Sequence, residues 1–212
     1  MPQPSTALLE PRKSPMQARS TASVDAILEA TIQVLLATGK ERLTTTRVAA
    51  RAGVSVGTLY QYFPNKNSLL QAVLKRHFDA VSAAVEAVCA AQRGGTLASM
   101  AQALVSAFLE AKMHDPATSV AFYSVSADVD GVQLARAVAL QMHGVIAAML
   151  RTAINRELNN PDLAATMLQG AMAGVSRRLL ESSSPATLVA PMRAELIDMV
   201  AAYLERCSQP IL

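Results

Sequence analysis

The sequence predicts an all-α fold, and three observations support this prediction. Of the 212 residues, 51% are hydrophobic and alanine is abundant, so a sizeable core can form. Almost no stretch shows the alternation of apolar and polar residues that is typical of a half-buried strand. Apolar residues recur instead at helical spacing, as Val24, Ile27, Leu28, Thr31 and Leu35 do within residues 24–39.

Residues 43–70 contain start and stop signals for two short helices. Thr44 suits the cap of a helix over residues 45–52, because its hydroxyl can accept from the unbonded amides of the first turn. Gly53 can take the left-handed conformation that ends a helix without a Cβ clash. Ser55 can cap a second helix of about seven residues, which Pro64 stops by restricting the residue before it. A helix, a glycine turn and a helix of this size form the supersecondary unit that lays its second helix in the major groove of DNA.

The second helix would expose small, hydroxyl-bearing and aromatic side chains and no acidic one. Those predicted to face base edges are Thr46, Val56, Gly57, Thr58, Gln61 and Tyr62. Those predicted to contact phosphate oxygens are Thr45, Arg47, Ser55, Tyr60 and Lys66. The alternative is an ordinary helical hairpin with a solvated face, but such a face more often carries Glu and Lys.

Over about its first quarter the chain resembles the tetracycline-repressor (TetR/AcrR) family of bacterial transcriptional regulators. The resemblance rests on TTTRVAARAGVSVGTLYQYFPNK at 44–66 and on the preceding VDAILEATIQVLLATG at 24–39. One departure is Asn67-Ser68, where the family usually places an acidic residue near the start of the next helix. The resemblance implies a three-helix DNA-binding domain followed by a helical domain for ligand binding and dimerisation. It also implies a sequence-specific regulator, most often a repressor, that binds a pseudo-palindromic operator as a homodimer.

The chain is predicted to divide into three parts. Residues 1–20 are proline-rich and predict a flexible arm, residues 21–66 the helix-turn-helix domain, and residues 67–212 the C-terminal domain. Within the last part we expect helices over 68–91, 97–113, a short segment after Pro116, 132–158, 162–181 and 187–206. Residues 1–66 carry eight Lys or Arg against four Asp or Glu, and the rest of the chain eleven against twelve. The excess positive charge therefore lies on the part expected to meet phosphates.

The last two helices are apolar on more than one face, which predicts two packing partners: the chain's own core and a second copy. The residues predicted at this dimer interface are Leu163, Met167, Gly170, Ala171, Gly174, Leu188, Met192, Leu196, Met199 and Tyr203. The alternative is that these residues only fill an intramolecular core.

The middle helices carry adaptable methionines and a few polar groups that could line a cavity for a small effector. The residues predicted to line it are Met100, Leu104, Phe108, Met113, Phe122, Tyr123, Met142, His143, Gln169 and Met172. Because tryptophan is absent and phenylalanine scarce, a lipophilic or acidic effector fits better than a cationic one. The alternative for each residue is a place in the core.

Other function classes have weaker support. No metal-ligand spacing, nucleophile elbow, phosphate loop or dinucleotide fingerprint occurs, so we expect no enzyme, no metal and no cofactor. A redox-responsive regulator would use Cys89 or Cys207, which lie far apart in apolar helical patterns. A non-specific nucleic-acid-binding protein is a further alternative. No uninterrupted apolar run reaches membrane length and no signal-peptide core is present, so a cytoplasmic protein without a membrane partner is expected.

Overall fold

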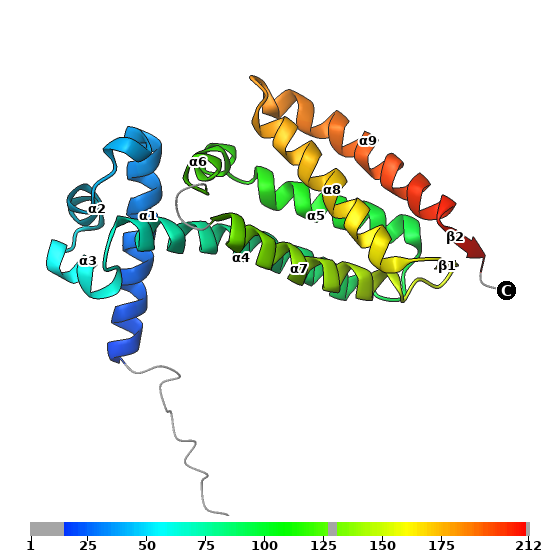
Figure 1. The fold of residues 1–212 in the computed structure, drawn as a ribbon, viewed down its shortest axis with the longest axis horizontal. Coiled ribbons are helices and arrows are strands. Elements are labelled where there is room, and N and C mark those ends of the chain that lie inside the picture. The colour runs from blue at the N-terminus through cyan, green and yellow to red at the C-terminus, as the bar shows by residue number, and fades with distance from the viewer. Residues whose placement is uncertain (1–14, 127–130, 211–212) are drawn as a thin grey trace, which may run out of the picture. The chain divides into compact units, whose positions relative to one another are not determined.

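The computed structural model describes residues 15–126 and 131–210 (Figure 1). Within these ranges the chain forms nine helices, two short strands and two compact units that meet between Leu69 and Leu70. The helices are α1 (Pro15–Arg42), α2 (Thr45–Ala52), α3 (Val56–Tyr62), α4 (Lys66–Ala91), α5 (Leu97–Met113), α6 (Pro116–Ser126), α7 (Gly131–Leu150), α8 (Pro161–Leu180) and α9 (Pro185–Arg206). The strands are β1 (Arg156–Leu158) and β2 (Ser208–Pro210). The predicted all-α class is confirmed.

The first unit contains α1, α2, α3 and the start of α4. Its core is built from buried side chains of these helices and of the turns between them, all apolar except Thr31: Ile27, Leu28, Thr31, Leu35, Leu43, Val48, Ala49, Leu59, Phe63 and Leu69. Thr31 is fully buried because its hydroxyl donates to the Ile27 carbonyl at 2.7 Å, which satisfies it within the helix. Packing of α1 on α2 and of α2 on α3 holds the two short helices in place.

The beginning of α1 differs from the prediction. The helix starts at Pro15, so residues 15–20 are helical rather than part of a flexible arm. Proline is well suited to the first turn of a helix, because its fixed φ is helical and its missing N–H has no partner there in any case. The rest of the predicted arm, residues 1–14, lies outside the described residues.

The second unit is a helical bundle with one continuous core. α5 packs against α8 and α9, and α7 packs against α8. α5 is the central element, since eight of its side chains are buried: Leu97, Met100, Ala101, Leu104, Val105, Phe108, Leu109 and Lys112. α5 has the predicted bounds, whereas α8 and α9 each start slightly earlier than predicted, at prolines that again occupy the first turn.

The end of α7 also differs from the prediction. The helix stops at Leu150 rather than continuing to residue 158. Polar side chains compete with the helix here: the Thr152 hydroxyl donates to the Met149 carbonyl at 2.7 Å and accepts from the Gly94 amide at 2.9 Å. The Asn155 side chain accepts from the Leu97 amide at 3.2 Å. The following residues form β1, which pairs antiparallel with β2 at the end of the chain.

Among the described residues, two helical segments are long and apolar enough to cross a membrane: Ser20–Arg42 and Gly131–Leu150. Core helices of soluble proteins often have the same length and composition. Each has a place in a folded unit, because α1 buries Ile27 and Leu28 and α7 buries Met142 and Ile146.

Candidate nucleic-acid interface and ligand cavity

The ends of α2 and α3 are capped as the sequence predicts. The Thr44 hydroxyl accepts from the Arg47 amide at 3.3 Å, and the Ser55 hydroxyl accepts from the Thr58 amide at 2.9 Å. Gly53 has φ 70° and ψ 27°, the left-handed conformation, and its amide bonds back to the last turn of α2. The two short helices and the turn between them are therefore fixed by local hydrogen bonds.

α3 presents an exposed face with Gly57, Tyr60 and Gln61 on it, while Val56, Thr58 and Tyr62 are half-buried. The hydroxyls of Thr45 and Tyr60 lie 3.1 Å apart and join α2 to α3. The hydroxyls of Ser55 and Thr58 lie 2.8 Å apart, so each already has one partner in the free protein. Thr46, predicted with the base-facing residues, is exposed on α2.

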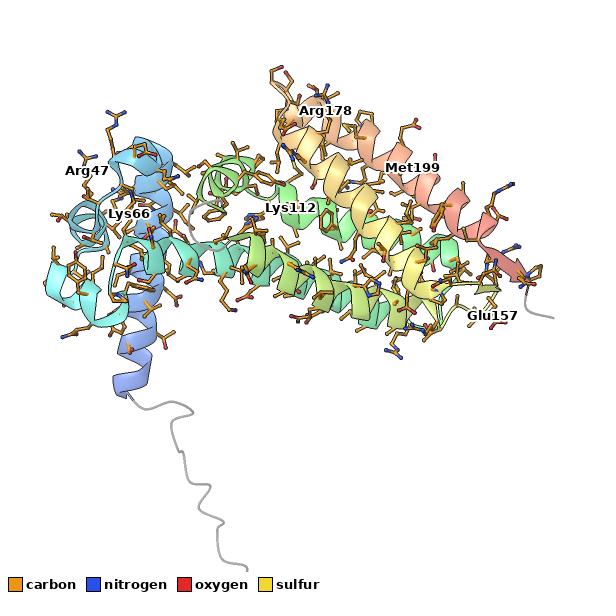
Figure 2. All side chains as sticks on the ribbon, in the orientation of Figure 1. Arg47, Lys66, Lys112, Glu157, Arg178 and Met199 are labelled. Carbon is orange, nitrogen blue, oxygen red and sulfur yellow. The ribbon has the colours of Figure 1, made fainter. Side chains whose placement is uncertain are left out.

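The two predicted phosphate-binding cations are both bonded to the end of α1. Arg47 Nη1 donates to the Arg42 carbonyl at 2.9 Å, and Lys66 Nζ donates to the Lys40 carbonyl at 2.8 Å (Figure 2). Guanidinium and ammonium groups carry several N–H donors, so each bond leaves further donors for another partner. Lys66 thus has a structural role that its place in the sequence did not reveal.

α4 begins with reciprocal hydrogen bonds between its first residues and the preceding turn. The Asn65 side chain accepts from the Ser68 amide at 2.8 Å, and the Ser68 hydroxyl accepts from the Asn65 amide at 3.3 Å. This is the arrangement of a capping box, with serine in the place of the usual Glu or Gln. Ser68 therefore takes over one function of the acidic residue that the sequence lacks.

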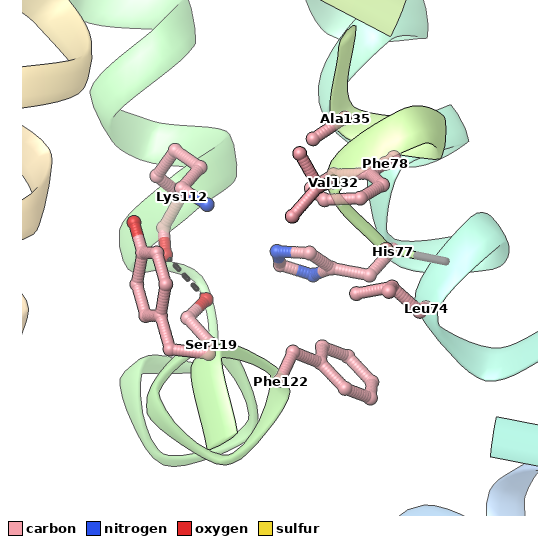
Figure 3. Close-up of a pocket in the computed structure, with 10 residues that line it drawn as sticks. Leu74, His77, Phe78, Lys112, Ser119, Phe122, Val132 and Ala135 are labelled. Carbon is pink, nitrogen blue, oxygen red and sulfur yellow. Dashed lines mark hydrogen bonds between the residues drawn. The ribbon is translucent and has the colours of Figure 1, made fainter. Parts of the chain in front are cut away.

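The second unit contains a cavity with two adjacent chambers, which share part of their walls. The first has a volume of about 330 Å³, and its walls come from α4, α5, α6 and α7: Leu74, His77, Phe78, Lys112, Ser119, Phe122, Tyr123, Gly131, Val132 and Ala135 (Figure 3). The second has a volume of about 260 Å³ and lies among α4, α5, α7 and α8, with Val81, Phe108, Val138, Met142, Gln169 and Met172 on its walls. Phe78, Lys112, Tyr123 and Ala135 line both chambers. Cavities of a few hundred Å³ with mostly apolar walls are typical of small-molecule sites.

Lys112 and His77 are the ionisable bases of this cavity. Lys112 is only 9% exposed, and its ammonium lies 5.5 Å from the centre of the Tyr123 ring. Burial lowers the pKa of Lys112, because a charged ammonium is poorly solvated there. The pKa of His77 is lowered to about 4, mainly by burial and secondarily by the positive charge of Lys112. The His77 ring is therefore neutral at pH 7.

The structure brings together six of the ten residues predicted for the cavity: Phe108, Phe122, Tyr123, Met142, Gln169 and Met172. Met100 and Leu104 are fully buried in the core, and Met113 packs against the core from its edge. His143 lies 3.0 Å from the Asp162 carbonyl, outside both chambers. These four residues therefore do not line the cavity.

The sequence prediction missed Lys112, although a signal for it was present. Lys112 follows Leu104, Phe108 and Leu109 on the apolar face of α5, at spacings of eight, four and three residues. A lysine in a position that the helical period assigns to the core is unusual, because lysine is almost never buried without a partner. His77 gave a weaker signal: it lies on the apolar stripe of α4, four residues after Val73 and four before Val81, but histidine is buried more often than lysine.

Two family comparisons cover most of the chain. Residues 27–73 match the family described as bacterial regulatory proteins, tetR family. Residues 96–204, just over half of the chain, match the tetracyclin repressor-like C-terminal domain. The chain belongs to the TetR family.

Individual TetR-family proteins agree with this assignment. The chain is 44% identical over 70 residues to the HTH-type transcriptional repressor KstR of Mycolicibacterium smegmatis, which is about a third of each chain (33%). A transcriptional regulator from Rhodococcus sp. RHA1 has a TM-score of 0.71 at 21% identity and covers 90% of this chain and 100% of its own. SmeT, the repressor of the SmeDEF multidrug efflux pump of Stenotrophomonas maltophilia, has a TM-score of 0.67 at 20% identity over 85% and 89%. The TetR fold thus extends through both units, and TetR-family proteins are DNA-binding regulators that are generally not enzymes.

The outer face of α8 and α9 in this TetR-family chain carries most of the residues that the sequence predicts at a dimer interface. Leu163, Met167 and Met199 are each 52–54% exposed, and Leu188 is 39% exposed. Met199 lies on α9 (Figure 2). Gly170 and Gly174 are exposed on α8, and a Cβ at either would meet nothing within 4 Å. Ala171, Met192 and Tyr203 are partly buried at the edge of the core. Leu196 is 2% exposed and belongs to the core of its own chain rather than to this face.

Cys89 of this TetR-family chain is a poor candidate for redox chemistry. Cys89 is 1% exposed, and its pKa is raised to about 11 by burial and then by Glu86. A thiol with a raised pKa is a poor nucleophile. Cys207 is half-buried at the end of α9. Among the described residues no group of three or more His, Cys, Asp or Glu side chains is placed to hold a metal ion.

Proposed function

We propose that this protein is a dimeric repressor that binds a pseudo-palindromic operator through α3 and leaves it when a small lipophilic molecule enters the cavity. It acts in the cytoplasm, with residues 21–66 as the DNA-binding part and residues 67–212 as the effector-binding and dimerisation part. The two compact units, which meet between Leu69 and Leu70, support this division.

The observation that carries the proposal is the exposed face of α3. From residue 43 to residue 66 the chain has no acidic side chain, and both helices of the motif are fixed by caps. In the proposed complex the base edges are read by Thr46, Val56, Gly57, Thr58, Gln61 and Tyr62. The phosphates are held by Thr45, Arg47, Ser55, Tyr60 and Lys66.

Dimerisation supplies the specificity that one helix lacks. α3 has only seven residues, so a single copy contacts few base pairs. Two copies held about 34–36 Å apart meet successive major grooves on one side of the duplex. The exposed apolar side chains of α8 and α9 supply the surface that pairs the two chains.

In this proposal the cavity is the site at which an effector regulates operator binding. α4 starts in the first unit, directly after α3, and ends in the second, where His77 and Phe78 line the first chamber. An effector that binds more tightly to a conformation with a tilted α4 stabilises that conformation. In it, the two copies of α3 are out of register with the major grooves. A coupling free energy of about 1–3 kcal/mol lowers operator affinity about 5–150-fold.

The test is a footprint on the DNA that flanks the gene, followed by affinity measurements on the protected site. Gln61→Ala should weaken binding to this site by about 1–3 kcal/mol per half-site, and it should leave binding to scrambled DNA unchanged. Arg47→Ala should weaken binding to both DNAs alike and flatten the salt dependence, since phosphates carry no sequence information.

Gln71→Ala is the matched control, because Gln71 is an exposed glutamine on α4 outside the proposed interface. It should bind the protected site as the unchanged protein does. Equal affinity of the unchanged protein for every DNA, with a steep salt dependence, would instead identify a non-specific nucleic-acid-binding protein.

A further inference from the structure

We propose that the effector is an amphiphilic carboxylate whose head group binds Lys112 and whose apolar tail fills the second chamber. This inference rests on the proposed function of the cavity as the effector site. It goes beyond that function because it names the chemical class of the effector and the residue that selects it.

Lys112 is a largely buried cation whose ammonium has no polar partner in the described part of the chain. It is 91% buried on α5, and among residues 15–126 and 131–210 no hydrogen bond or ion pair of its ammonium is present. The face of the Tyr123 ring at 5.5 Å offers a cation–π contact but no hydrogen-bond acceptor. Buried charges are normally paired, so an unpaired ammonium on a cavity wall is explained best by an anion that enters from solution.

The charges around Lys112 leave room for such an anion. No carboxylate lines either chamber within the described part of the chain. Asp115 is close enough to influence His77, but it is exposed and accepts from the Thr118 amide at 3.0 Å and from the Thr118 hydroxyl at 2.5 Å, as the cap of α6. The Asp115 carboxylate therefore caps a helix and does not pair with the lysine.

His77 provides a second group for the same head group. Its ring points into the first chamber toward Lys112 and Ser119 (Figure 3). Its Nε2 atom is buried and has no hydrogen-bond partner among the described residues. The neutral ring can donate through Nε2 to a carboxylate oxygen. Ser119 contributes less, because its hydroxyl already donates to the Lys112 carbonyl at 2.9 Å.

The remaining walls select an apolar tail. The second chamber shares the Lys112 wall with the first, and its other walls include Phe108, Met142 and Met172, all of them buried. Its polar side chains are already engaged, since Gln169 donates to the Ala139 carbonyl at 2.9 Å and Ser176 to the Ala173 carbonyl at 3.0 Å. A molecule with its anionic end at Lys112 therefore extends an apolar body along this chamber.

The single positive charge favours a carboxylate over a phosphate monoester. Lys112 is the only Lys or Arg among the described residues that line the chambers, and His77 is neutral at pH 7. A carboxylate carries one negative charge, whereas a phosphate monoester carries about 1.5 to 2 at that pH. A phosphate would keep part of its charge uncompensated in a desolvated site.

The experiment measures binding of decanoate, decanol and decyl phosphate to the full-length protein by isothermal titration calorimetry. Decanoate should bind about tenfold or more tightly than decanol, because it adds a charge-assisted hydrogen bond to Lys112. Lys112→Met should weaken decanoate binding about 10–100-fold and leave decanol binding within about threefold. Decyl phosphate should bind less tightly than decanoate.

The matched control is Lys75→Met on α4, because Lys75 is 59% exposed and pairs with Asp79 at 2.6 Å. It should bind all three compounds as the unchanged protein does. The melting temperature of Lys112→Met shows that the variant folds, and it should equal or exceed that of the unchanged protein, because the substitution removes an unpaired buried charge.

Each of the following results would overturn the inference in the binding experiment: no binding of decanoate, equal binding of decanoate and decanol, tighter binding of decyl phosphate, or a melting temperature several degrees lower for Lys112→Met.

A gel-shift titration with the operator separates this inference from the proposed function. If decanoate binds through Lys112 without weakening operator binding, the carboxylate site stands and effector release fails. If decanol releases the operator and decanoate does not, effector release stands and the carboxylate inference fails.

Discussion

Gly57 is a residue of α3 that the fold itself does not require. A Cβ added to it would meet only the Ser55 Oγ, at the ordinary distance of 3.7 Å. Its φ is not positive, in contrast to those of Gly39, Gly53 and Gly94. Glycine within a helix costs about 0.5–1 kcal/mol relative to alanine, so the folded protein alone does not explain this choice. The close approach of DNA to the backbone that we propose for α3 gives a reason for it.

Gly57→Ala should therefore stabilise the protein and weaken operator binding. We expect the free energy of unfolding in urea to rise by about 0.5–1 kcal/mol, since alanine is the better helix former. We expect operator affinity to fall by about 1 kcal/mol or more, because the methyl group separates α3 from the base pairs. Gly144→Ala on α7, where a Cβ also has open space, should stabilise the protein without changing DNA binding. Unchanged operator affinity for Gly57→Ala would contradict the close approach.

The place of Lys112 on the cavity wall was only weakly indicated by the sequence. Helical spacing assigned its position to the apolar face of α5, but spacing says nothing about what lies opposite. His77, thirty-five residues earlier in the sequence, and Tyr123 come close to it only in the folded bundle. Residue-level prediction therefore found six residues on the apolar walls and missed both bases.

Among the elements, α2 and α3 were predicted with the least error because their boundaries are local. The cap of each helix lies within three residues of the amide that it accepts from, and the turn between them depends on one left-handed glycine. α7 was predicted eight residues too long because its end depends on partners far away in the sequence. The Gly94 amide and Thr152 are 58 residues apart, as are the Leu97 amide and Asn155.

The start of α4 gives a prediction at this scale. Ser68→Ala removes the acceptor for the Asn65 amide, so we expect the free energy of unfolding to fall by about 1 kcal/mol. Ser68→Glu restores the usual acceptor of a capping box and adds a favourable negative charge at the helix start. It should be at least as stable as the unchanged protein when both are unfolded in urea and followed by circular dichroism. Equal stability of the alanine and glutamate variants would mean that the capping box contributes nothing.

At the scale of the whole molecule, the outer face of α8 and α9 is the feature that the single chain leaves unexplained. Met167 and Met199 are each 52% exposed and lie beside a shallow apolar groove of about 120 Å³ that also contains Leu168, Val200 and Tyr203. Large apolar side chains clustered in this way are typical of an interface. In a two-fold dimer each of these residues is present twice, so one substitution alters the interface at two places.

Met199→Glu should convert the dimer to a monomer in sedimentation velocity. Burying two additional carboxylates without partners opposes association, while the exposed position in the single chain leaves its fold intact. Operator affinity should fall because the contacts of one half-site are lost. Leu140→Glu is the control, since Leu140 is an exposed leucine (66%) on α7, outside the proposed interface. A Met199→Glu protein that remains dimeric would place the interface elsewhere.

The sequence by itself determined the helix-turn-helix motif and its caps, because hydrogen bonds within a few residues of the chain specify them. It also determined the helical class and the bounds of α5, through the spacing of apolar side chains. Only the tertiary structure decided where α7 ends, which apolar residues line the cavity instead of the core, and that Lys112 shares a chamber wall with His77 and has no polar partner among the described residues. Each of these depends on groups brought together from different helices, and the order of residues along the chain does not contain those distances.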